Sequence, residues 1–189
     1  MMINISNTFT GYFLIATPKL NGSIFEKTVT YLCEHHEQGA MGIIVNHPLS
    51  MDVQGMLTEL NITINNRYIN QLPLAFGGPV HNQTRLVLHR DGKQWAHTCY
   101  PTRDIAVTAS TDILEALAKQ DQTIDVLMTV GYASWKAGQL ETEIRENNWL
   151  FCPAEAAIVF DVPAKKRWQT ALKSIGLEPN QLLSKGSYC

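Results

Sequence analysis

Long apolar runs are absent from this 189-residue sequence. A membrane-spanning helix needs about 20 consecutive apolar residues, whereas the run at Met41–Val45 is only as long as a strand. The first residues, Met1 to Gly11, place no basic side chain ahead of the apolar stretch Tyr12–Ala16, which is too short for the core of a secretion signal. The sequence therefore predicts a cytoplasmic protein without membrane association.

Cysteine is scarce, and its spacing excludes two common kinds of site. The cysteines lie far apart and form no Cys-x-x-Cys pair, which argues against a zinc ribbon and a thioredoxin-like motif; they are Cys33, Cys99, Cys152 and Cys189. We expect reduced thiols, no cofactor and no bound metal.

Charge is low and nearly balanced. Fifteen Lys and Arg oppose 17 Asp and Glu, which gives a formal net charge of −2 and a pI near 6.3. Such a chain does not attract nucleic acid as a whole. Internal repeats, low-complexity tracts and linkers are also missing, and the length suits one domain. We therefore predict a single domain over residues 1–189.

The first half of the chain is rich in strand signals. Thr28–His36 and Met41–Asn46 are separated by a short Gln38–Gly39 loop, which predicts an antiparallel hairpin. With that loop, Cys33 lies opposite Ile44 and Tyr31 opposite Asn46.

Strand and helix patterns alternate along the rest of the chain, with a turn at Arg90-Asp91-Gly92. The remaining predicted strands are Tyr12–Ala16, Leu74–Phe76, Arg85–His89, Ile105–Ala109, Ile124–Val130, Trp149–Cys152 and Ala157–Phe160. Helices are predicted over Asp52–Leu60, from a capping box at Asp112 and Glu115, around Leu140 and Ile144, and from Pro163 to a stop at Gly176. This pattern predicts an α+β (mixed α/β) fold with a large mixed β-sheet packed against helices.

Several ordered strings together resemble the YqgE/AlgH family. They are Gly11 to Ala16, Cys33-Glu34-His35, Gly39 to Gly42, Asn46-His47-Pro48, Gly77-Gly78-Pro79-Val80, and Gly131 to Glu141. The resemblance runs from the first strand to the terminal helix and implies a large mixed sheet with helices around it. Two departures stand out: His47 replaces the usual arginine, and Leu86 follows Arg85 where the family usually has glycine.

What the resemblance implies about function is a regulatory label, inherited from alginate production, in a family of mostly uncharacterised bacterial proteins. Our first hypothesis is a non-enzymatic regulatory or interaction protein that acts through another protein. The second is a small-molecule enzyme, such as a Cys/His-dependent hydrolase. The third is direct nucleic-acid binding through Lys165, Lys166, Arg167 and Lys173 of the terminal helix, which we consider disfavoured because no DNA-recognition motif accompanies these residues.

The densest group of reactive side chains is Cys33-Glu34-His35-His36. Strand alternation places Cys33 and His35 on one face, where a thiol and an imidazole suit a nucleophile and its base, or two zinc ligands. However, same-face neighbours are about 7 Å apart, and further metal ligands such as His47 or His89 cannot be placed from sequence. A structural, partly buried cysteine is the favoured interpretation.

Other candidate residues come from the family strings. Asn46 follows the hairpin, and Gly77 and Gly78 form a turn without the Lys-Ser/Thr of a phosphate loop. Trp135 and Gln139 are expected one helical turn apart, presenting either an aromatic platform or core packing.

Overall fold

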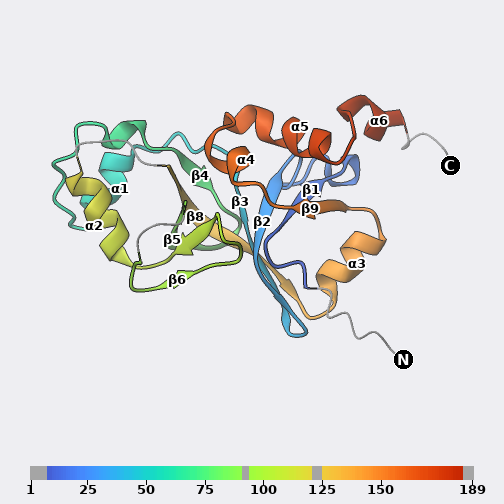
Figure 1. Cartoon of the computed structure of the whole chain (residues 1–189), viewed down its shortest axis with the longest axis horizontal. Coiled ribbons are helices and arrows are strands. Elements are labelled where there is room, and N and C mark those ends of the chain that lie inside the picture. Colours follow the sequence, from blue (N-terminus) through green and yellow to red (C-terminus); the bar gives the residue numbers. More distant parts are fainter. Residues whose placement is uncertain (1–7, 91–93, 121–124, 185–189) are drawn as a thin grey trace.

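A nine-stranded sheet that curls through the molecule forms the centre of the fold (Figure 1). The structure is a computed structural model that describes residues 8–90, 94–120 and 125–184; the predicted turn at Asp91-Gly92 lies outside them. The strand order is β6-β7-β5-β8-β3-β2-β1-β9, with β4 also pairing with β8. All pairs are antiparallel except β4 with β8, so the sheet is mixed and the predicted α+β class is confirmed.

The strands and helices have these bounds. The strands are β1 (Tyr12–Ala16), β2 (Val29–His36), β3 (Gly39–Ile44), β4 (Leu74–Phe76), β5 (Val80–His89), β6 (Thr98–Cys99), β7 (Ala106–Thr108), β8 (Val126–Lys136) and β9 (Trp149–Pro153). The helices are α1 (Val53–Glu59), α2 (Thr111–Lys119), α3 (Gln139–Arg145), α4 (Ala156–Phe160), α5 (Ala164–Ser174) and α6 (Pro179–Ser184), with short 3-10 helices η1 (Pro18–Leu20) and η2 (Ile69–Gln71).

Alternation along the strands divides the core between helices on the two faces. In β1, Phe13 and Ile15 join the cluster under α4 and α5, whereas Leu14 and Ala16 face the cluster that contains Leu140 of α3. Helices α1 and α2 pack on β4, β5 and the first part of β8 (Figure 1). The long strand β8 thus contributes to all three clusters and joins the two ends of the sheet.

The predicted hairpin is confirmed, but its register differs from the prediction. Strands β2 and β3 are antiparallel, and His36 pairs with Gly39, so the loop is 37–38. Because the loop is 37–38 rather than 38–39, and because a bulge at Cys33 shifts the pairing further, Thr30 rather than Cys33 lies opposite Ile44. Gly39 is therefore a strand residue, where a Cβ would come within 2.3 Å of the Trp135 carbonyl oxygen.

Two further local predictions are wrong. The segment predicted as a strand at Ala157–Phe160 is helix α4, because its Ile158 and Val159 fill the core as adjacent residues of one turn. Helix α2 begins at Thr111, so Asp112 lies in its first turn rather than at the cap, where its Oδ1 accepts from Ser110 Oγ and the Ile113 amide. The prediction at Ala157–Phe160 failed because a short apolar run fits a strand or a helix equally well from sequence alone.

Candidate functional site

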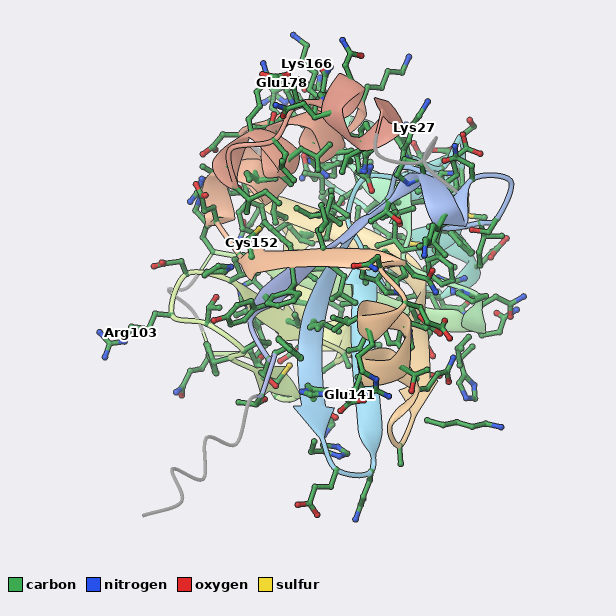
Figure 2. The ribbon with its side chains drawn as sticks, turned by 90° about the vertical axis from the view of Figure 1, so that its right-hand side faces the viewer. Lys27, Arg103, Glu141, Cys152, Lys166 and Glu178 are labelled. Carbon is green, nitrogen blue, oxygen red and sulfur yellow. The ribbon has the colours of Figure 1, made fainter. Side chains whose placement is uncertain are left out.

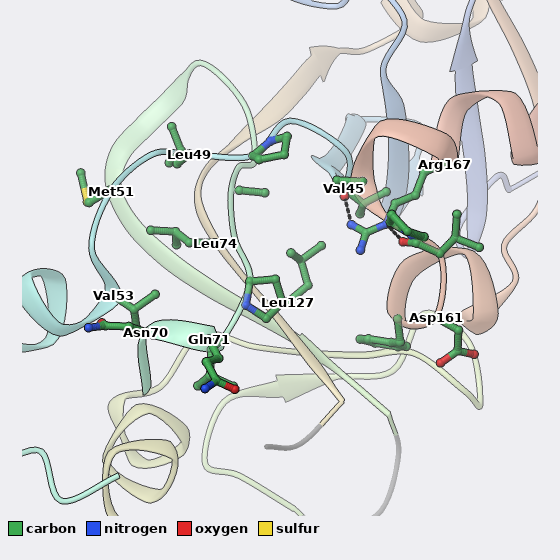
Figure 3. Close-up of a pocket in the computed structure, with 18 of the residues that line it drawn as sticks. Val45, Leu49, Met51, Val53, Asn70, Gln71, Leu74, Leu127, Asp161 and Arg167 are labelled. Atoms are coloured by element: carbon green, nitrogen blue, oxygen red, sulfur yellow. Dashed lines mark hydrogen bonds between the residues drawn. The ribbon is translucent and has the colours of Figure 1, made fainter. Parts of the chain in front are cut away.

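A groove of about 620 Å³ lies between the chain from Pro48 to Val53, η2 and β4 on one side and the α4–α5 corner on the other (Figure 3). Most of its lining is apolar, and it includes Leu49, Met51, Val53, Leu72, Pro73 and Leu74. Met51 at its rim is 49% exposed. A groove of this volume with few polar groups has the size and character of a small-molecule site.

Arg167 supplies the charge of the groove. Its residue is only 6% exposed, because it lies on the buried side of α5 together with Ala171 and Leu172. Its Nε donates to the Val162 carbonyl at 2.9 Å, and its Nη1 donates to the Val45 carbonyl. Nη2 has no hydrogen-bond partner among the described residues and points into the groove (Figure 3).

No carboxylate is seen to compensate this guanidinium among the described residues. Burial lowers the pKa of Arg167 to about 10, which reflects loss of water around the charge without a neighbouring acid to offset it. Asp161 lines the groove, but Arg90 Nη2 holds both its oxygens at 2.8 and 2.7 Å. Asp52 also lines it and caps α1, where its Oδ1 accepts from the Gln54 amide at 3.0 Å.

The bulge in β2 separates the side chains of the predicted Cys33 and His35 pair. Cys33 is 3% exposed, its thiol donates to the Tyr31 carbonyl at 3.7 Å, and burial raises its pKa well above the ordinary value. Cys99 and Glu34 raise that pKa further. Cys33 is therefore a core residue, as the favoured interpretation had it, and its thiol is held in the neutral form.

His35 does not share the site of Cys33, contrary to the prediction. Its Nδ1 accepts from the Phe9 amide at 3.0 Å, and its Nε2 lies 2.9 Å from Glu141 Oε1 of α3. The extra residue of the bulge breaks the alternation on which the same-face prediction depended, so that Glu34 is the charged neighbour of Cys33. The imidazole thus ties β2 to α3.

Asn46, Gly77 and Gly78 have structural roles. Asn46 Oδ1 accepts from the Val29 amide at 2.7 Å, and its Nδ2 donates to the Lys27 carbonyl at 2.8 Å. A Cβ on Gly77 would lie 2.2 Å from the Gly131 carbonyl oxygen, and one on Gly78 would lie 2.2 Å from the Tyr132 carbonyl carbon. The two glycines therefore let the chain cross directly over β8.

Trp135 and Gln139 meet at a residue that the sequence did not single out. Trp135 lies on β8 rather than on a helix, so the predicted helical-turn relationship is wrong. Glu143 of α3 accepts from Trp135 Nε1 at 2.9 Å and Trp149 Nε1 at 2.8 Å through Oε2, and from Gln139 Nε2 at 2.9 Å through Oε1. Core packing of Trp135 is confirmed.

The basic cluster on α5 is smaller at the surface than its sequence indicates. Lys165 and Lys166 are exposed, and Lys166 lies at the outer side of the helix layer (Figure 2), whereas Arg167 is buried. The signal was present in the sequence: Arg167 lies four residues before Ala171, which is one helical turn along the buried stripe.

The part of the chain that the structure describes has neither a metal-binding cluster nor a membrane-spanning helix. Within the described ranges, no group of three or more His, Cys, Asp or Glu is placed to hold a metal ion. None of the helices in those ranges has the length and apolar character needed to cross a membrane.

Comparisons with known proteins agree with this fold. A family model described as AlgH-like matches residues 13–180. A UPF0301 protein of Idiomarina loihiensis is 42% identical over 178 residues, covering 93% of this chain and 96% of the relative, and one of Legionella pneumophila strain Corby is 40% identical over 180 residues, covering 95% and 96%. The solution structure of the AlgH protein from Pseudomonas aeruginosa superimposes with a TM-score of 0.79 at 34% identity, covering 100% of both chains.

Proposed function

Because the chain belongs to the AlgH-like family, we propose that it is a cytoplasmic, non-enzymatic regulatory protein that influences transcription by acting through another protein. The main support for this role is the state of Cys33 and His35, the pair on which the enzymatic alternative depends.

A cysteine nucleophile needs a thiolate that a base can generate and a substrate can reach. Cys33 has the opposite environment, since it is buried and its pKa is raised. Both imidazole nitrogens of His35 are already engaged, one by the Phe9 amide and the other by Glu141. These contacts favour a binding or regulatory role over hydrolysis by this pair.

Direct DNA binding is disfavoured by the position of Arg167. The Arg167 guanidinium is bonded to the Val45 and Val162 carbonyls, so the exposed basic residues of the cluster are Lys165, Lys166 and Lys173. Three lysines on a chain of net charge −2 give few phosphate contacts. An effect on transcription is therefore expected to require a protein partner.

The experiment uses a strain of the source organism that lacks this gene. Transcript levels are measured after the gene is restored as the wild type or as Cys33→Ala, with the fold of the variant checked by circular dichroism. We expect equal restoration, because the thiol serves packing. Loss of restoration by a folded Cys33→Ala protein would instead support the enzyme.

The partner is sought in the same strain with photo-cross-linking amino acids at the exposed residues Tyr100 and Phe151. A cross-linked protein is then purified, and its complex with this chain is measured by calorimetry. A regulatory effect that the purified chain reproduces on promoter DNA without any other protein would contradict the proposal.

A further inference from the structure

The guanidinium of Arg167 has lost much of its water and has no countercharge among the described residues, and both effects destabilise the groove when no ligand is bound. Arg167 is only 6% exposed, so its guanidinium loses much of its hydration, and the two backbone carbonyls that it contacts carry no net negative charge to balance it. The burial that lowers the Arg167 pKa toward 10 is the same effect. A bound anion at Nη2 would restore the missing countercharge.

The shape and polarity of the groove restrict that anion. Beyond Nη2 the lining is mainly apolar, with Leu49, Leu74 and Leu127 along the groove in Figure 3. A free phosphate would leave this surface uncovered, whereas an apolar chain would bury it. Nη2 is the guanidinium nitrogen that the Val45 and Val162 carbonyls leave over, and its N–H groups can donate charge-assisted hydrogen bonds to a carboxylate.

The acids of the groove restrict the ligand further. Asp161 is neutralised by Arg90, but Asp52 has no cation partner among the described residues. Asp52 adjoins Val53, which lies at the end of the groove opposite Arg167 (Figure 3). A second carboxylate at that end would meet a like charge.

We propose that this groove binds a small monocarboxylate with an apolar body, its carboxylate on Arg167 Nη2 and its chain along Leu74 and Leu127 toward Met51. The inference is independent of the regulatory proposal, since such a site serves a regulator or an enzyme equally.

The test titrates the ¹⁵N-labelled full chain with sodium octanoate below its micellar concentration and follows amide and Arg Nε–H signals by NMR. We expect saturable shifts in the Val45–Val53 and Asn70–Ala75 segments and at Arg167 Nε–H. A charge-assisted hydrogen bond is worth about 1.5–3 kcal/mol, so 1-octanol and octylammonium should bind at least about tenfold more weakly. Octanedioate should also bind more weakly than octanoate because of Asp52.

Two variants separate recognition from folding. Arg167→Lys keeps the charge, but its single nitrogen cannot hold the Val45 and Val162 carbonyls and also donate into the groove, so it should weaken octanoate binding about tenfold. Since Arg167 also anchors α5, Met51→Glu at the exposed rim provides a second variant that places a negative charge in the groove and should weaken octanoate more than octanol. Ile24→Glu, at a residue that is 47% exposed and outside the groove, is the matched control and should leave the Kd unchanged.

Equal affinity for octanoate and 1-octanol would overturn the proposal, because it would show an apolar groove without carboxylate recognition. Unsaturable shifts, or shifts centred at Lys27 and Trp168 in the smaller pocket beside α5, would also overturn it.

Discussion

Trp135 and Trp149 pack edge to face, with ring centroids 6.1 Å apart and an interplanar angle of 80°, and both indole nitrogens donate to the same oxygen of Glu143. Both residues are buried, and they come from β8 and β9, which are not neighbours in the sheet. A single carboxylate of α3 therefore holds this end of the sheet to the helix that covers it.

Glu143→Ala should lower the free energy of unfolding by about 2–4 kcal/mol, because it leaves two buried N–H groups without an acceptor. Urea denaturation followed by far-ultraviolet circular dichroism measures this loss. Glu143→Gln retains an acceptor oxygen and should lose less. Glu146→Ala is the control, because the Glu146 carboxylate is exposed and accepts a long hydrogen bond of 3.5 Å from Asn148 Nδ2; equal losses for Glu143→Ala and Glu146→Ala would contradict the shared-acceptor role.

The Glu141 carboxylate contributes to the stability of the fold, and this contribution is lost at acid pH. Its own backbone N–H in the first turn of α3, followed by His35, lowers the pKa of its carboxyl below the ordinary value. A lowered folded-state pKa stabilises the fold above the unfolded-state pKa of about 4.3, and this contribution is lost as pH falls through the folded-state value.

Glu141→Gln should therefore reduce the free energy of unfolding at pH 6, and the difference from the wild type should shrink as the pH falls below the unfolded-state pKa of about 4.3. The effect should be small, since the Glu141 side chain is 38% exposed. Chemical denaturation at each pH measures it, with Glu37→Gln in the exposed hairpin loop as control. A difference that grows toward pH 3 would show that the sign is wrong.

Cys33 should resist alkylation. Iodoacetamide at pH 7 should modify exposed Cys99 well before Cys33, because the buried thiol is neutral and shielded. Cys33→Ser should cost about 1–3 kcal/mol if the hydroxyl finds no better acceptor than the Tyr31 carbonyl. Mass spectrometry of peptides gives the alkylation rates. Fast reaction at Cys33 together with unchanged stability of the serine variant would restore the enzymatic hypothesis.

Gly78→Ala should prevent the native crossing over β8. Its φ is +151° and the new Cβ would lie 2.2 Å from the Tyr132 backbone, so either the crossing or β8 must move. Gly22→Ala is the control for a positive φ, because its φ is +79° and no atom lies within 4 Å of the added Cβ. We expect a loss of about 1 kcal/mol for Gly22→Ala and several-fold more for Gly78→Ala, measured by thermal denaturation. Equal losses would mean that strain alone, and not close approach, requires glycine at residue 78.

DNA binding by the purified chain should be weak at about 150 mM salt, because few cations remain on the surface of α5. Fluorescence anisotropy with labelled duplexes tests this. Submicromolar, sequence-selective binding would reveal a recognition element that neither the basic cluster nor the fold indicates.

Elements with local signals could be predicted from the amino-acid sequence. Strands Tyr12–Ala16 and Leu74–Phe76 have the bounds predicted from their apolar runs, and the hairpin between Thr28 and Asn46 forms because a short loop holds its two arms side by side. The mixed sheet with helices also followed from the alternation of patterns. Buried Cys33 was predicted from its apolar neighbours.

Which side chains meet depends on the packing of segments that are distant in the chain. The bulge at Cys33 arises from pairing with β3, so no alternation rule applied to β2 alone could place His35 beside Glu141. Arg167 was grouped with its lysine neighbours although its helical spacing to Ala171 places it on the buried stripe, and only the packing of α5 against Val45 decides which carbonyl its guanidinium meets. Both outcomes depend on contacts between residues more than 100 positions apart, which local physical preferences cannot specify.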